Sequence, residues 1–141
     1  MYRKPEWYNR YYNLLKEQLI QTKDFKEVLC KLSEEYDGKL LDPSYTSKLI
    51  ATVDPNKPVW DIYVLKNLDL TAKWNMYNGK STNQRIDAAV SIYSEIEEKC
   101  IKFMGTDEGK NCIGVFNYFL PGYKDRITDM KKLDLFLWTK R

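Results

Sequence analysis

Apolar residues recur every three to four positions along most of this sequence, and that spacing limits the fold more than any other feature. The longest stripe consists of Ile86, Ala89, Val90, Tyr93, Ile96, Cys100 and Phe103. Positions three and four apart lie on one face of an α-helix, so the stripe predicts an amphipathic helix over residues 81–103. Ser81 and Gln84 match the capping box with which many helices begin.

Six further segments carry the same spacing or a helix-start signal, and we expect each of them to be helical. They are residues 6–21, 24–36, 42–53, 60–68, 110–119 and 128–138. Residues 70–81 show no stripe, and there we expect a loop. No segment shows a convincing alternation of apolar and polar residues, the pattern that is typical of strands. The sequence therefore predicts an all-α protein, with six or seven helices packed as a single compact domain over residues 1–141.

Composition places the chain among globular proteins, because 43% of its 141 residues are hydrophobic and 30% are charged. No apolar run is long enough to span a membrane. The first residues lack the apolar stretch of a signal peptide, so we expect a cytoplasmic protein without a membrane partner. A net charge of +3 permits contact with a phosphate backbone but does not require it.

The chain contains no histidine, and this excludes several kinds of catalytic and metal site. Ser-His-Asp triads, Cys-His dyads and histidine-ligated zinc or iron are all ruled out. The three cysteines, Cys30, Cys100 and Cys112, form no C-x-x-C pair and are interpreted as reduced thiols. We expect neither a metal nor a cofactor, and any chemistry would use Lys, Asp, Glu, Tyr or Cys side chains.

An aspartate inside an apolar run is the most unusual local feature of the sequence. Asp61 lies in the segment 56–70, NKPVWDIYVLKNLDL, directly after Trp60 and before Ile62. Burying a carboxylate there is costly unless hydrogen bonds satisfy it. In the simpler interpretation, Asp61 accepts backbone N–H groups at the start of a helix. In the other, it takes part in chemistry together with Lys48 on the preceding helix.

Residues 44–68 resemble the core of the helix-hairpin-helix DNA glycosylases. In that family a hairpin carries a catalytic lysine, and a catalytic aspartate follows in a segment that reads roughly V-D-T-H-V. Here Lys48 in TSKL matches the lysine, and PVWDIYVLKNLDL places Asp61 on the aspartate. Tyr63 falls on the histidine of the motif and Lys66 on a later arginine. The glycine-rich turn of the family, L-P-G-V-G, has no counterpart in this sequence.

The resemblance implies a nucleic-acid-binding helical domain, with or without catalytic activity. In an active member, Lys48 would be the amine nucleophile, and Asp61 would act as a base or would stabilise a sugar cation. Basic and aromatic residues near the hairpin and the C-terminus complete the expected interface. The residues expected to contact nucleic acid are Lys57, Tyr63, Lys66, Lys131 and Lys132.

Two alternatives to this function stay open. Eleven tyrosines and four tryptophans also suit a small interaction or inhibitor protein, of the kind that phages and mobile elements encode, acting through an aromatic surface. The second alternative is an active lyase-type DNA glycosylase that uses Lys48. The sequence leaves open which nucleic acid or protein is bound, whether the chain is an enzyme, and its oligomeric state.

Overall fold

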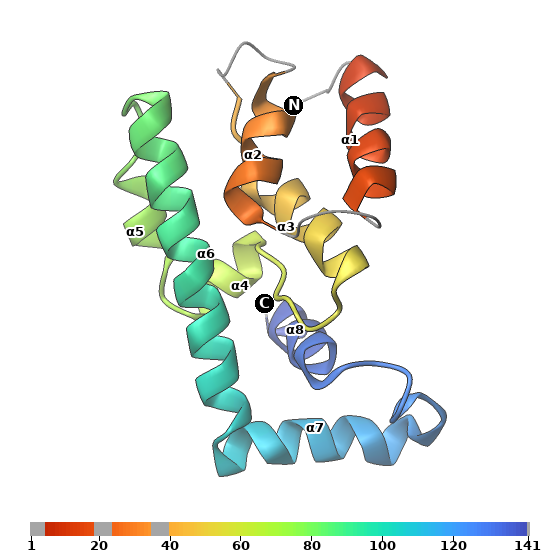
Figure 1. Ribbon diagram of the computed structural model, residues 1–141. Coiled ribbons are helices and arrows are strands. Elements are labelled where there is room, and N and C mark those ends of the chain that lie inside the picture. Colours follow the sequence, from red (N-terminus) through yellow and green to blue (C-terminus); the bar gives the residue numbers. More distant parts are fainter. Residues whose placement is uncertain (1–4, 19–23, 35–39, 141) are drawn as a thin grey trace.

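The computed structural model describes residues 5–18, 24–34 and 40–140. Within these ranges the chain forms eight α-helices and one short 3-10 helix, with no strand (Figure 1). The helices are α1 (Pro5–Gln18), α2 (Phe25–Glu34), α3 (Pro43–Val53), α4 (Ile62–Asn67), α5 (Thr71–Asn75), α6 (Thr82–Met104), α7 (Asp107–Phe119), η1 (Pro121–Tyr123) and α8 (Asp129–Thr139). The prediction of an all-α protein is confirmed. The expected ends of the first two helices, at residues 21 and 36, lie outside the described residues.

Helix α5 corrects the prediction of a loop over residues 70–81, and it raises the number of helices above the expected six or seven. No side chain caps its first turn, so the local sequence carries no helix-start signal. Tertiary packing holds the helix instead. The Trp74 ring meets the Trp60 ring edge to face at 5.2 Å, and the Arg85 guanidinium lies 5.6 Å from the centre of the Trp74 ring. A helix this short depends on such contacts, because one turn is not stable alone.

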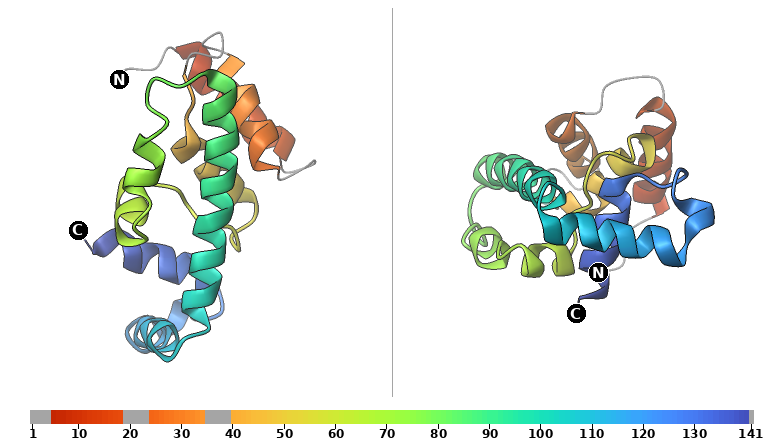
Figure 2. Two further views of the ribbon diagram at one scale, coloured as in Figure 1. Left: turned by 90° about the vertical axis from the view of Figure 1, so that its left-hand side faces the viewer. Right: turned by 90° about the horizontal axis from the view of Figure 1, so that it is seen from below.

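Helix α6 lies where the long apolar stripe predicts it and runs most of the length of the molecule (Figures 1 and 2). The Ser81–Gln84 capping box is present at its start. Its inward face belongs to one core, together with side chains from α1 to α4 and from α8. The fully buried members from the described helices include Trp7, Leu29, Leu49, Ile50, Ile92, Ile96 and Leu133. Burial of these apolar side chains is the main source of stability for such a fold.

The connection between α3 and α4 is held to both α3 and α6 by hydroxyl groups. The Ser47 hydroxyl accepts the backbone N–H of Trp60 at 2.8 Å, and the Tyr93 hydroxyl donates to the carbonyl of Pro58 at 3.0 Å. The side chain of Asp42 accepts the Tyr45 N–H at 3.1 Å and so caps α3. These bonds fix the point at which the chain enters α4, and with it the position of the candidate site.

Helix α7 crosses the end of α6, on the side of the molecule away from α1 and α2 (Figures 1 and 2). It begins at Asp107, earlier than the expected residue 110, because the Thr106 hydroxyl accepts the Gly109 N–H at 3.1 Å and caps the helix. Gly109 is the only buried residue of α7. Most of this helix therefore faces solvent.

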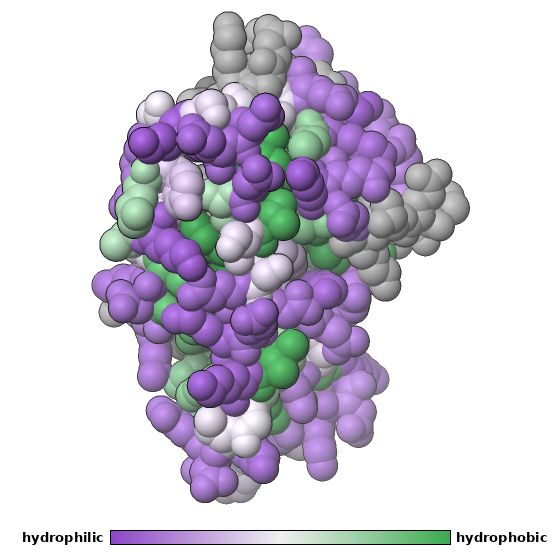
Figure 3. Space-filling view, turned by 60° about the vertical axis from the view of Figure 1, so that its left-hand side comes forward, coloured by the Kyte–Doolittle hydropathy of each residue, from purple (hydrophilic) through white to green (hydrophobic). Residues whose placement is uncertain are grey.

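Five exposed apolar residues gather around the end of α7 and η1, and we call them the α7 tip. They are Val115, Tyr118, Phe119, Leu120 and Tyr123. The surface on the side of α5 contrasts with the α7 tip. It is mostly hydrophilic, with small, separate apolar areas (Figure 3). None of the helices in the described part of the chain is both long and apolar enough to cross a membrane.

Candidate functional site

An open cleft between α3, α4 and α8 contains Lys48 and Asp61, the two residues predicted from the sequence as a candidate catalytic pair. Its lining residues are Ser44, Lys48, Trp60, Asp61, Ile62, Tyr63 and Trp138. Its volume is about 310 Å³, at the lower end of the range of small-molecule sites. The hairpin of α3 and α4 thus brings Lys48 and Asp61 to one surface. Trp138 comes from α8, and no local sequence pattern could have linked it to the hairpin.

Asp61 is the N-cap of α4. Its Oδ1 atom accepts the N–H groups of Tyr63 and Val64, each at 2.8 Å, and its own backbone is extended. These bonds satisfy the carboxylate and place its charge at the positive end of the helix dipole. Both of these bonds end on Oδ1, so the second carboxylate oxygen, Oδ2, is not used by the cap. Asp61 therefore has a structural role, because it fixes the first turn of α4, which forms part of the cleft wall.

Lys48 is exposed on α3, and its ammonium lies 5.2 Å from the centre of the Tyr45 ring. A second carboxylate, Asp134 of α8, is close enough to both cleft residues to interact with them. Burial raises the pKa of Asp134, and the nearby Asp61 carboxylate raises it further. The Lys131 ammonium, which donates to it at 3.1 Å, and Lys48 act in the opposite direction. No local sequence pattern links Asp134 to the cleft, because it lies far along the chain from the hairpin.

The other residues expected to contact nucleic acid are dispersed. Tyr63 lies in the cleft, with its ring edge to face with Trp138 at 6.3 Å. Lys66 is exposed on α4. Lys57 lies outside the cleft and pairs with Glu97 at 2.7 Å. Tyr63 is thus the only one of these residues that the structure joins to the cleft.

Lys131 and Lys132 have different environments although they are adjacent in the sequence. Lys131 is exposed and pairs with Asp134. Lys132 is only 4% exposed, and its ammonium donates to the Lys124 carbonyl at 2.9 Å and to Asp129 Oδ1 at 3.2 Å. These bonds keep the Lys132 charge inside the fold, out of reach of a phosphate backbone.

The cysteines do not point to a reactive site. Burial raises the pKa of the Cys100 thiol to about 12, so it stays protonated near neutral pH. Burial also raises the pKa of Cys30. In the part of the chain that the structure describes, no group of three Cys, Asp or Glu side chains is arranged to hold a metal ion.

Substitution of Asp61 tests its capping role. We expect Asp61→Ala to lower the free energy of unfolding by about 1 kcal/mol, because two backbone N–H groups at the start of α4 lose their acceptor. Asp61→Asn keeps an acceptor and is expected to lose much less. Urea denaturation of the three proteins at neutral pH measures the difference. Equal midpoints for all three would contradict the capping role.

Comparison with known proteins gives no relative from which a function could be transferred. No family model matches the chain, and no significant match was found among curated proteins or among solved structures.

Proposed function

We propose that the protein binds nucleic acid and accommodates an unpaired base in the cleft between α3, α4 and α8. One observation carries this proposal. Lys48, Asp61 and Tyr63, which the glycosylase resemblance selected by sequence alone, line one cleft together with an aromatic residue, Trp138, that the resemblance did not include.

The chemistry of the cleft suits a base attached to a phosphate backbone. Tyr63 and Trp138 offer aromatic surface on which a base can stack, a contact that every base can make. Lys48 at the cleft and Lys66 on α4 are exposed cations that can approach the flanking phosphates. We therefore expect binding that tolerates many sequences, weakens with salt and favours single strands or unpaired positions over regular duplex.

The proposal is for binding without catalysis. A lysine nucleophile in an enzyme is often placed in a desolvated, apolar pocket. Lys48 is exposed, and the Asp61 carboxylate is already engaged as a helix cap. Both observations favour a site that holds a base over one that cleaves its bond to the sugar.

Fluorescence anisotropy with labelled single-stranded DNA and RNA over a salt series tests the binding. We expect affinity to fall steeply as salt rises, and Lys48→Gln to weaken binding and to reduce the salt slope by about one. Trp138→Ala is expected to remove about 1–3 kcal/mol of binding free energy, because one stacking contact is lost. Lys80→Gln, an exposed lysine outside the cleft, is the charge-matched control and should bind like the parent.

One outcome of this experiment, and one outcome of a separate trapping experiment, would contradict parts of the proposal. Absence of binding even at low salt would remove nucleic acid as the ligand. Borohydride treatment of a mixture with abasic-site DNA separates binding from lyase chemistry. An adduct that forms with the parent protein and is lost in Lys48→Gln would show that the site is catalytic.

Protein interaction is the second candidate function, and the α7 tip is the observation that favours it. Tyr118 is 78% exposed and Phe119 is 73% exposed, and a cluster of exposed apolar residues is typical of an interface. The order of charges along the segment favours a second copy of the chain as the partner. The charges before the tip sum to −1 (Asp107, Glu108 and Lys110), and those in the turn that follows it sum to +1 (Lys124, Asp125 and Arg126). An antiparallel copy would therefore bring opposite charges together.

Sedimentation equilibrium tests this self-association. We expect the parent protein to form a concentration-dependent dimer, and the double variant Tyr118→Ser, Phe119→Ser to be monomeric because it loses the exposed aromatic surface. Met76→Ser, a change at an apolar residue that is 70% exposed outside the tip, is the matched control and should leave the dimer intact. A parent protein that stays monomeric at all concentrations would rule out the second copy as the partner.

A further inference from the structure

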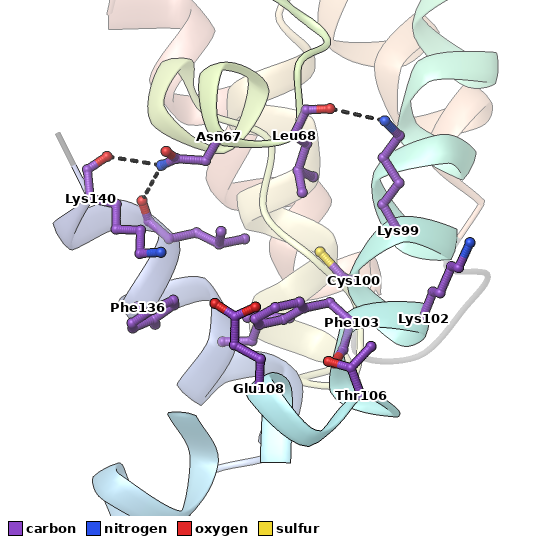
Figure 4. Close-up of a pocket in the computed structure, with 12 residues that line it drawn as sticks. Asn67, Leu68, Lys99, Cys100, Lys102, Phe103, Thr106, Glu108, Phe136 and Lys140 are labelled. Carbon is purple, nitrogen blue, oxygen red and sulfur yellow. Dashed lines mark hydrogen bonds between the residues drawn. The ribbon is translucent and has the colours of Figure 1, made fainter. Parts of the chain in front are cut away.

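A second cavity lies between α4, α6 and α8, beside the start of α7, and it is distinct from the cleft (Figure 4). Its volume is about 440 Å³, within the range of small-molecule sites. The two cavities have no lining residue in common. Binding of a ligand in this cavity would therefore be separate from the proposed binding of nucleic acid in the cleft.

The wall of the cavity is apolar and is built from three helices. Its apolar residues are Leu68, Cys100, Phe103, Leu133, Phe136 and Leu137. Phe103 and Phe136 are only partly covered by other residues, so they present ring surface to the cavity (Figure 4). Such a wall favours an aromatic or aliphatic group, because contact removes apolar surface from water.

The rim of the cavity carries more positive than negative charge. Lys99, Lys102 and Lys140 contribute three ammonium groups, and Glu108 contributes one carboxylate. The Lys99 ammonium donates to the Leu68 carbonyl at 3.0 Å and also lies 3.8 Å from Glu95. The Lys140 ammonium lies 4.7 Å from the centre of the Phe136 ring, and Figure 4 shows it on the side that faces Glu108. The rim of the cavity therefore has a net positive charge.

Asn67 fixes one side of the cavity. Its amide donates to the carbonyl of Leu137 at 2.8 Å and to that of Lys140 at 2.9 Å, and so ties the end of α8 to α4 (Figure 4). The Asn67 amide group lines the cavity and is hydrogen-bonded to its wall. A ligand that enters the cavity should therefore change the magnetic resonance signals of this amide group.

We propose that this cavity binds a small amphipathic anion, with its apolar part against Phe103 and Phe136 and its acidic group near Lys140. Carboxylates, sulfonates and phosphate monoesters share this chemistry. Glu108 opposes the binding of such a ligand and limits its affinity, because it adds one negative charge to the same rim.

Titration with naphthalene-1-carboxylate tests the proposal, with nuclear magnetic resonance and calorimetry as readouts. Two control compounds carry the same naphthalene ring with a different charge at neutral pH. Naphthalene-1-methanol is uncharged, and naphthalene-1-methylammonium is a cation. We expect the carboxylate to bind most tightly and the ammonium compound least. The Asn67 side-chain resonances are expected to shift with the same affinity as the calorimetric signal.

Two charge variants with opposite expected effects locate the site. Lys140→Gln should weaken carboxylate binding about two- to fivefold, and Glu108→Gln should strengthen it by a similar factor. Lys80→Gln removes an exposed positive charge outside the cavity and should leave the affinity unchanged. Equal affinity for the three compounds would overturn the preference for an anion. Absence of saturable binding, or binding that leaves Asn67 and both charge variants unaffected, would overturn the site itself.

Discussion

Replacing Trp60 with alanine is expected to lower the free energy of unfolding by about 3–5 kcal/mol, the usual cost of removing a large aromatic side chain from a core. The Trp60 side chain is only 4% exposed although it also lines the cleft. It stacks with Phe25 at a centroid distance of 6.5 Å and meets Trp74 edge to face at 5.2 Å. Its removal would therefore delete the contacts that join α2 and α5 to the segment before α4.

Chemical denaturation followed by circular dichroism measures this loss. Trp138→Ala is the matched control, because Trp138 lines the same cleft but is 45% exposed. We expect Trp138→Ala to change stability by much less than Trp60→Ala, since Trp138 is already 45% exposed and Trp60 only 4%. Similar denaturation midpoints for the two variants would mean that the Trp60 ring does not contribute to the core as described.

Gly109→Ala is expected to destabilise the protein by about 1–3 kcal/mol through overpacking at the junction of α6 and α7. A β-carbon on Gly109 would lie only 2.7 Å from the carbonyl carbon of Phe103 and would meet its carbonyl oxygen even more closely. Both are backbone atoms of the last turn of α6, so no side-chain rotation can relieve the overlap. The two helices would have to separate.

Gly114→Ala in the same helix is expected to have the opposite effect. No atom lies within 4 Å of a β-carbon built at Gly114, so the substitution meets no obstacle. Alanine favours the helical backbone over glycine by about 0.8–1.0 kcal/mol in an exposed position. Thermal denaturation of the two variants should therefore move the Tm in opposite directions. A lower Tm for Gly114→Ala, or an unchanged one for Gly109→Ala, would contradict the described packing of α7.

The sequence predicts those parts of the fold that depend on neighbouring residues. The stripe from Ile86 to Phe103 and the Ser81–Gln84 capping box place α6 to within a residue, because both signals lie in the helix or at its N-cap. Helix α5 was missed because it has no side-chain cap and depends on the contact between Trp74 and Trp60. Such a contact becomes visible only when the chain has folded.

The same distinction applies to the candidate site. Lys48 and Asp61 could be placed together because they lie on consecutive helices joined by a short connection. Trp138 and Asp134 reach the same region from α8, and only the tertiary structure brings them there. Lys132 could not be distinguished from a surface lysine in the sequence. Asp129 lies one turn before it on α8, but the other acceptor, the Lys124 carbonyl, is brought to its ammonium only by the turn before α8.

The bonds that hold the connection between α3 and α4 have a consequence for any ligand of the cleft. Ser47 and Tyr93 fix the segment before Asp61, and Asp61 fixes the first turn of α4. The conformational entropy of this wall is therefore lost when the protein folds and not when a ligand arrives. A ligand that enters the cleft meets a preorganised surface, so its contacts there can contribute to affinity without first having to order the chain.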